Sequence, residues 1–412
     1  MIPAETRLAH PPLPCDPEIE FTLELGEALH RYGMPAHRVE GAMEAVSRTL
    51  GHEARFYSTP TAILASFGPV TDLKTGLLRL PPGEMDLEKL VEVDALSGQV
   101  IAGVRSPEDG SREVKRILAA PSRYGPWSTL LAFFFAAAGA ALLFGGGWRE
   151  VLVAGTASLL IGFLDRLSKT TVTPLARVLE PVSAMLAAAL AALGAAYLGP
   201  MSAQVATLAG LIVLLPGLSL TVALTELATR NLTSGTSRLT GAGLVFLQLG
   251  FGVALGGRLA VVLPAAAPAA LMPPGWLDLV AMAVLALALS VWLRARPADM
   301  GWIALVGAIG YGGARAGEAA FGTELGAFFG ALLVGMASNG IARLRDKPAM
   351  VTIIPALIVL VPGSIGFRSL EALLARDVLG GVAIAFSTVL AGVALCAGLL
   401  FGYAMVPPRR VL

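Results

Sequence analysis

Charged side chains are scarce in this sequence: only 14% of its 412 residues are Asp, Glu, Lys or Arg, whereas 55% are hydrophobic. A soluble domain carries about 25% charge, so the composition excludes an ordinary soluble globular protein. The net charge of +1 gives no basic field that would attract nucleic acid, and no nucleic-acid partner is expected. The two cysteines, Cys15 and Cys396, lie at opposite ends of the chain and suggest no disulfide framework.

Common enzyme motifs are also missing from the sequence. It has no GxxxxGK[ST] phosphate-binding loop, no HExxH zinc motif and no GxSxG nucleophile elbow. No cofactor and no metal are therefore expected. His30, His37 and His52 lie near the N-terminus without metal-ligand spacing, so a membrane-bound enzyme that uses them is kept only as a less favoured function. A non-transporting regulatory or scaffold protein is the least favoured function, because the internal repeat described below is typical of transporters.

The charge that is present is concentrated at one end. More than half of the charged residues, and all four histidines, lie within the first 126 residues. The sequence therefore predicts a small cytoplasmic α+β domain at 18–122, preceded by a disordered tail at 1–17. The tail is rich in proline and has no apolar core of the kind that directs secretion, so the domain is expected to stay in the cytoplasm.

Ten apolar runs follow, and a membrane-spanning helix needs about 20 such residues. The runs lie near 127–146, 150–164, 181–198, 202–220, 239–263, 276–293, 301–316, 324–342, 349–363 and 378–405. With a cytoplasmic N-terminus, twelve Lys and Arg residues fall on the cytoplasmic side of these helices and five on the outer side. The positive-inside rule thus predicts a multi-pass protein of the cell (inner) membrane with both termini in the cytoplasm.

An internal repeat organises these runs. The segment LIVLLPG at 211–217 recurs as LIVLVPG at 357–363, and Glu180 and Glu324 precede the two prolines by similar distances. Five helices is an odd number, so the second copy must enter the membrane from the opposite side. The prediction is a mainly α, polytopic membrane protein with ten transmembrane helices in two inverted five-helix repeats, at 127–263 and 276–405. Such repeats are typical of secondary transporters that work by alternating access.

The two Pro-Gly pairs are the leading candidates for substrate binding. Pro216-Gly217 and Pro362-Gly363 should interrupt their helices, because proline removes a backbone donor and glycine relaxes the backbone. Irregular backbone within a membrane persists where protein or a water-filled cavity supplies partners. The alternative is a packing kink near the membrane surface. Ser338 and Asn339 are further candidates to contact a substrate, although they could equally bond across helices.

Four carboxylates are candidates for proton coupling or gating: Glu180, Glu324, Glu226 and Glu371. A carboxylate within a bilayer costs about 2.5–3.5 kcal/mol on insertion scales, so it usually faces a cavity or a partner. Glu180 and Glu324 could instead be helix-start charges. Glu226 and Glu371 could simply pair with Arg230 and Arg368, which are also the candidates for an ion pair or for binding an anion.

The chain resembles the threonine/serine exporter family. The resemblance rests on GEALHRYGMPAHRVEGAMEAVSRTLG at 26–51, on TPTAI at 59–63 and on the two Pro-Gly helices, and it extends from about Phe21 to Tyr403. It implies export of small hydroxyl amino acids driven by the proton motive force, with the cytoplasmic and membrane parts fused in one chain. The wider family is also linked to dicarboxylate export, which stays open as an alternative.

The same resemblance bears on the N-terminal domain and on the partners. It implies a structural or gating role for the signature residues His30, Arg31, Gly33, His37, Arg38 and Glu40. The expected partners are a small-molecule substrate, the proton and the lipid bilayer. The glycine-rich helix at 301–317 offers a small-residue face that could serve internal packing or contact with a second copy, so a homo-oligomer is also considered.

Overall fold

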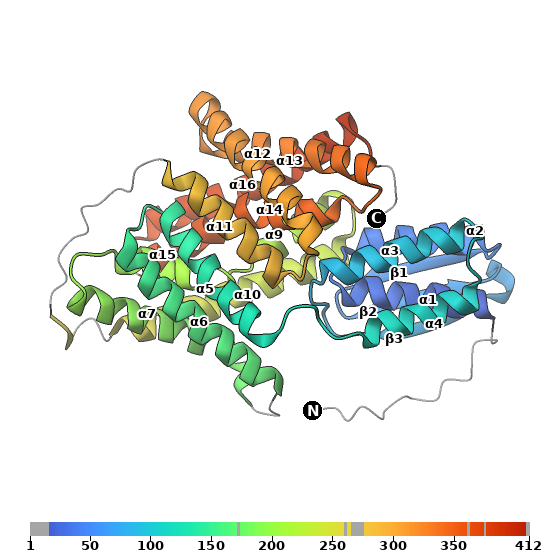
Figure 1. The fold of residues 1–412 in the computed structure, drawn as a ribbon, viewed down its shortest axis with the longest axis horizontal. Helices are drawn as coiled ribbons and strands as arrows, with labels where there is room; N and C mark the ends of the chain where they lie inside the picture. Colours follow the sequence, from blue (N-terminus) through green and yellow to red (C-terminus); the bar gives the residue numbers. More distant parts are fainter. Residues whose placement is uncertain are drawn as a thin grey trace.

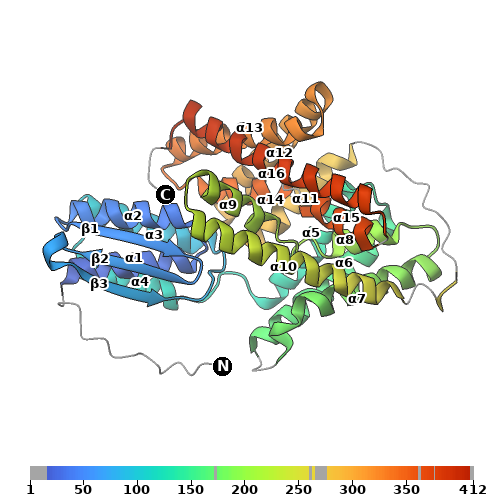
Figure 2. The same cartoon turned by 180° about the vertical axis from the view of Figure 1, so that it is seen from behind.

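The protein consists of an N-terminal α+β domain and a larger helical part (Figures 1 and 2). The computed structural model describes residues 16–170, 174–258, 262–264, 276–360, 363–374 and 376–408. Pro362 and the tail 1–15 lie outside the described residues.

The N-terminal domain pairs four helices with one small sheet. Its elements are α1 (Pro17–Arg31), α2 (Ala36–Thr49), β1 (Ala54–Thr59), β2 (Ala62–Phe67), the short η1 (Val70–Asp72), β3 (Lys74–Arg79), α3 (Leu87–Ile101) and α4 (Pro107–Ala119). The strands are antiparallel in the order β1-β2-β3. Apolar side chains from one face of each helix form the core with the sheet, among them Phe21, Leu25, Val39, Ile63 and Leu90.

The helical part is built from α5 (Pro126–Leu143), α6 (Trp148–Thr170), η2 (Pro174–Arg177), α7 (Leu179–Tyr197), α8 (Ala203–Gly210), α9 (Gly217–Ala228), α10 (Leu232–Gly257), α11 (Leu277–Trp292), α12 (Pro297–Phe321), α13 (Thr323–Arg345), α14 (Met350–Leu360), α15 (Gly363–Leu374) and α16 (Val378–Met405). Counted over the described residues, seven helical spans are long and apolar enough to cross a membrane: Pro126–Leu143, Trp148–Lys169, Leu179–Tyr197, Leu232–Gly257, Leu325–Arg345, Met350–Leu373 and Val378–Met405. The span Met350–Leu373 joins α14 to α15 across residues 361 and 362, which lie outside the described residues. The protein is therefore a mainly helical, multi-pass membrane protein.

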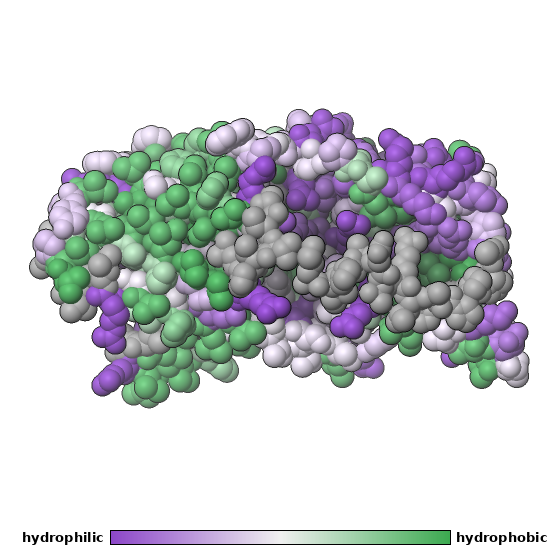
Figure 3. Space-filling model, turned by 90° about the horizontal axis from the view of Figure 1, so that it is seen from below, coloured by the Kyte–Doolittle hydropathy of each residue, from purple (hydrophilic) through white to green (hydrophobic). Residues whose placement is uncertain are grey.

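The surface agrees with this assignment. Large apolar side chains of the helical part are exposed, including Phe163, Phe251 and Phe386 at 53%, 66% and 70%. Figure 3 shows hydrophobic residues gathered over the helices and hydrophilic residues over the N-terminal domain. Lipid would cover these helices, because an apolar surface of this extent is unusual on a soluble monomer.

Glycines set the close crossings between helices. On α10, a Cβ added at Gly252 would lie 2.2 Å from the Pro181 carbonyl oxygen of α7. On α16, a Cβ added at Gly398 would lie 2.3 Å from the Phe328 carbonyl oxygen of α13. A second glycine follows four residues later in both helices, at Gly256 and Gly402, which is the GxxxG spacing that lets helix backbones approach.

The N-terminal domain lies against one end of the helical part (Figures 1 and 2). It contacts that end through α9, α10, the connection between α11 and α12, and the C-terminal end of α6. Both halves of the helical part are therefore held by one domain at the same end.

Candidate functional site

One helix break lies at the first Pro-Gly pair, where the predicted run near 202–220 is divided into α8 and α9. At the second pair α14 ends at Leu360 and α15 begins at Gly363, and residues 361 and 362 lie outside the described residues. At about 1.5 Å per residue, the eight-residue α8 and twelve-residue α9 add up to about 30 Å, the thickness of a hydrocarbon core.

A small cavity lies between the two Pro-Gly segments. Its lining comes from both segments and from α11: Ile212, Val213, Leu215, Gly217, Leu218, Leu289, Trp292, Ile358 and Gly363. Its volume is about 40 Å³, enough for a few water molecules, so a larger solute would require the walls to part. A Cβ at Gly363 would lie 3.3 Å from the Gly217 Cα, so the two glycines are in van der Waals contact.

One helix N-terminus faces this cavity. Pro216 is the N-cap of α9 and makes no side-chain capping hydrogen bond, and Gly217 and Leu218 of its first turn line the cavity. Gly363, the first described residue of α15, lines the same cavity from the other half. An uncapped N-terminus carries partial positive charge, so the cavity favours a carboxylate at the start of α9.

Ser338 and Asn339 lie on α13 and are not part of this lining. Both are buried, at 0% and 1% exposure. Asn339 Nδ2 donates to the Val406 carbonyl oxygen at 2.7 Å, while Ser338 Oγ and Asn339 Oδ1 have no hydrogen-bond partner within the described part of the chain. In this conformation Asn339 joins α13 to the end of α16.

Glu226 makes more hydrogen bonds within the described residues than the other carboxylates predicted for proton coupling or gating. It lies at the end of α9, is fully buried, and accepts hydrogen bonds from Ser234 Oγ at 2.8 Å and from the Ala36 backbone N–H at 3.0 Å. Its ion-pair partner is Arg238, at 3.1 Å. The expected partner Arg230 is exposed and adopts a left-handed conformation, with φ of 67°, just beyond the end of α9.

The Ala36 hydrogen bond makes Glu226 a contact between the two parts of the protein. Ala36 begins α2, whose N-cap is Pro35, a residue with no side-chain acceptor. The carboxylate supplied by the end of α9 takes the place of that missing cap, and the helix dipole favours its negative charge. The Gly-Met-Pro break of the N-terminal domain is thereby docked on the helical part.

A second helix N-terminus docks nearby. The Leu87 and Glu88 backbone N–H groups of α3 donate to the Leu293 and Arg294 carbonyl oxygens just after α11, at 3.0 and 3.1 Å. The unpaired N–H groups at the start of α3 thus bond to unpaired carbonyl groups at the end of α11. Arg294 also lies 3.5 Å from Asp86, the N-cap residue of α3, and Arg296 pairs with Glu92 at 3.2 Å.

The remaining predicted carboxylates lie elsewhere. Glu371 on α15 accepts from Gln204 Nε2 of α8 at 2.8 Å, and Arg368 is exposed with its guanidinium over the Phe144 ring. Glu180 is half-buried in the first turn of α7. Glu324 belongs to α13, and its side chain lies outside the described residues.

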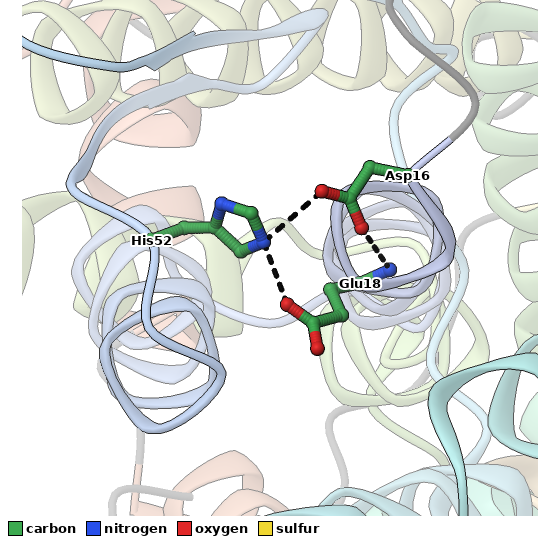
Figure 4. Close-up of side chains that lie close together, drawn as sticks. All are labelled: Asp16, Glu18 and His52. Carbon is green, nitrogen blue, oxygen red and sulfur yellow. Dashed lines mark hydrogen bonds and ion pairs between the residues drawn. The ribbon is translucent and has the colours of Figure 1, made fainter.

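The histidines of the N-terminal domain are divided between its two ends. His52 Nε2 lies 2.7 Å from Glu18 and 3.4 Å from Asp16, at the end of the domain that faces away from the helices (Figures 1 and 4). Both carboxylates contact one ring nitrogen, and Asp16 also caps α1 by accepting from the Glu18 N–H. This arrangement ties the end of α2 to the start of α1.

Sequence reasoning missed three contacts: Arg238 as the ion-pair partner of Glu226, Arg294 as the partner of Asp86, and Glu226 as the acceptor for the Ala36 N–H. The topology prediction counts both arginines only as basic residues of cytoplasmic loops. The signal that was available is the absence of a capping side chain before Ala36, which leaves a helix N-terminus in need of an external acceptor.

These features define the class of the protein as a multi-pass helical membrane protein with a cavity between its two Pro-Gly segments. Residues 20–260 match the family profile described as a threonine/serine exporter, and residues 278–405 match a second profile, Threonine/Serine exporter, ThrE. The chain belongs to the threonine/serine exporter family.

Curated relatives of the chain include yeast proteins. Pheromone-regulated membrane protein 10 of Candida albicans is 28% identical over 363 residues, which cover 85% of this chain and 33% of that protein. The protein of the same name from Saccharomyces cerevisiae is 27% identical over 362 residues, or 85% of this chain and 46% of the relative. The chain thus spans less than half the length of these two relatives. No solved structure matches the chain.

Proposed function

We propose that the protein exports small hydroxyl amino acids such as threonine and serine from the cytoplasm, driven by the proton gradient. The observation that carries the proposal is the cavity between Gly217 and Gly363, which the uncapped N-terminus of α9 faces and which the first described residue of α15 also lines. In transporters with broken helices, such N-termini bind the substrate carboxylate, and half-helix C-termini bind cations. The ends of α8 and α14 are the corresponding sites for the substrate ammonium.

Several contacts support two inverted five-helix repeats within this proposal. The α7–α10 and α13–α16 crossings use the same GxxxG arrangement. Glu226 follows one break and meets the N-terminal domain, whereas Glu371 follows the other and bonds to Gln204 at the start of α8. The helix ends that contact the N-terminal domain are ends that the charge distribution assigns to the cytoplasm. This agrees with ten membrane crossings and with both termini on the cytoplasmic side of the cell membrane.

Alternating access follows if the two repeats exchange conformations. We assign Glu226 a gating role, because its hydrogen bond to Ala36 fastens α9 to the N-terminal domain, which also holds α11 through Leu293 and Arg294. Opening the cytoplasmic side of the cavity would require one of these hydrogen-bonded contacts to break. Glu371, Glu180 and Glu324 are retained as candidates for proton coupling.

The dicarboxylate alternative is tested in the same experiment. No Lys or Arg lines the cavity in the part of the chain that the structure describes, which favours a zwitterion over a dianion. Flux of labelled threonine, serine and succinate would be measured in liposomes with and without an imposed proton gradient. Gradient-dependent flux of threonine or serine supports the proposal. Flux of succinate alone would mean that the exported substrate is a dicarboxylate.

A further inference from the structure

A second cavity lies where the N-terminal domain meets the helical part. Its volume is about 500 Å³, within the range of small-molecule sites. It is bounded by the end of α1, by the loop before α3 and by Arg294 after α11, and its lining comprises Glu27, His30, Arg31, Tyr32, Leu80, Pro81, Pro82, Gly83, Glu84, Asp86, Lys89, Leu118 and Arg294. None of these residues lines the cavity at the Pro-Gly breaks.

Two buried side chains of this lining carry polar atoms without a partner within the described ranges. They are His30 Nδ1 and Tyr32 Oη, in residues that are 4% and 5% exposed. Leaving a buried polar atom unpaired costs free energy, so such atoms in a cavity point to a ligand or ordered water that satisfies them.

The chemistry of these two atoms can be specified. Burial lowers the pKa of His30, so the ring is neutral at neutral pH. Because its Nε2–H donates to the Thr59 carbonyl oxygen at 3.1 Å, Nδ1 is left as an acceptor. Burial raises the pKa of Tyr32 to about 12, so its hydroxyl keeps the proton and can donate. Two residues of the cavity lining thus hold one neutral acceptor and one neutral donor, both buried beside the cavity.

Glu27 and Arg31 also line this cavity. Neither side chain forms an ion pair with another described residue. Its other charged side chains are engaged: Arg294 with Asp86 and Glu84, and Lys89 with the Ala120 carbonyl oxygen at 2.5 Å. An arginine can bind a carboxylate through two parallel hydrogen bonds. A carboxylate such as Glu27, next to the C-terminal end of α1, favours an ammonium group.

We propose that this cavity binds a free α-amino acid with a polar side chain, with the carboxylate on Arg31, the ammonium on Glu27 and the side-chain hydroxyl between His30 and Tyr32. The site is separate from the membrane cavity and does not depend on transport. Because Arg294 belongs to the helical part, a ligand here contacts both parts of the protein. It therefore binds the docked arrangement best and stabilises it, which makes the site a sensor of the amino-acid level in the cytoplasm.

The test is hydrogen exchange on the full chain in lipid nanodiscs, titrated with L-threonine. Threonine should slow exchange in segments 27–33 and 80–89, and also at the Leu87 and Glu88 amides that bond to Leu293 and Arg294. Glu27→Gln and Arg31→Gln should each weaken the apparent affinity at least tenfold, and Tyr32→Phe should weaken it several-fold. Arg48→Gln, an exposed arginine of α2 in the same domain, is the matched control and should bind as the unmodified protein does.

Two ligand analogues test the need for both charges. L-threoninol lacks the carboxylate and 3-hydroxybutyrate lacks the ammonium, so neither should protect these segments at the concentrations at which threonine does. Gly363→Val, which fills the membrane cavity, should leave the protection intact even if transport is lost. The inference is overturned if Glu27→Gln and Arg31→Gln bind threonine unchanged, if either analogue protects equally, or if protection disappears in Gly363→Val.

Discussion

Replacing Glu226 by alanine should release the N-terminal domain from α9. Of the three partners of Glu226, only the Ala36 N–H belongs to the N-terminal domain, so only this hydrogen bond crosses between the two parts of the protein. A hydrogen bond to a charged group contributes about 1.5–3 kcal/mol, which corresponds to a tenfold to 150-fold shift in the docking equilibrium. The variant should also unfold more easily, because it leaves the 22% exposed Arg238 without its carboxylate.

The assay is hydrogen exchange at the Ala36 amide in nanodiscs, where exchange should accelerate by the same tenfold to 150-fold factor. Glu150→Ala is the matched control. Glu150 is 5% exposed and also accepts two backbone N–H groups, from Gly147 and Ser202, but these lie at the end of the helices away from the N-terminal domain. Unchanged exchange at Ala36 in Glu226→Ala, or equal acceleration in Glu150→Ala, would refute the docking role.

Three further predictions concern other contacts. Gly363→Val should reduce flux at least tenfold, since even a Cβ there lies 3.3 Å from the Gly217 Cα, whereas Gly340→Ala on α13 has open space around it and should transport normally. Burial lowers the pKa of His37 from 6.5 to about 4 in the folded protein. As the pH drops through this range, the unfolded chain binds the proton before the folded protein does. The free energy of unfolding therefore falls, by about 3 kcal/mol in total. Thermal unfolding at several pH values should show that His37→Asn flattens this decline, and an unchanged slope would contradict the assignment. Burial raises the pKa of Asp86, and the nearby Arg294 opposes that rise because it favours the charged carboxylate. Arg294→Gln should therefore destabilise docking most at neutral pH and least below the pKa of Asp86. A loss of docking stability that is independent of pH would exclude this pairing.

The first helix break was predictable because its cause is local. Proline removes a backbone donor wherever it stands, and the chain is divided into α8 and α9 at LIVLLPG. Pro362 of the repeat lies outside the described residues, so the second break stays a prediction. The hairpin in the N-terminal domain was less visible. Arg55–Phe67 reads as one strand, but Pro60 and Thr61 turn the chain between β1 and β2.

The docking contacts could not be derived in the same way. Ala36 and Glu226 are 190 residues apart, and no local pattern connects them. Sequence proximity favoured Arg230 as the partner of Glu226, yet α9 ends at Ala228 and the left-handed Arg230 directs the chain away from the helix axis. Arg238 reaches the carboxylate instead because α10 returns alongside α9.

The most direct test of the exporter mechanism is flux of labelled threonine and serine from proteoliposomes, with and without a proton gradient, for the unmodified protein, Gly363→Val and Gly340→Ala. The account predicts gradient-dependent flux in the unmodified protein and in Gly340→Ala, and its loss in Gly363→Val. Absence of threonine and serine flux from folded protein, or flux that Gly363→Val leaves intact, would contradict it.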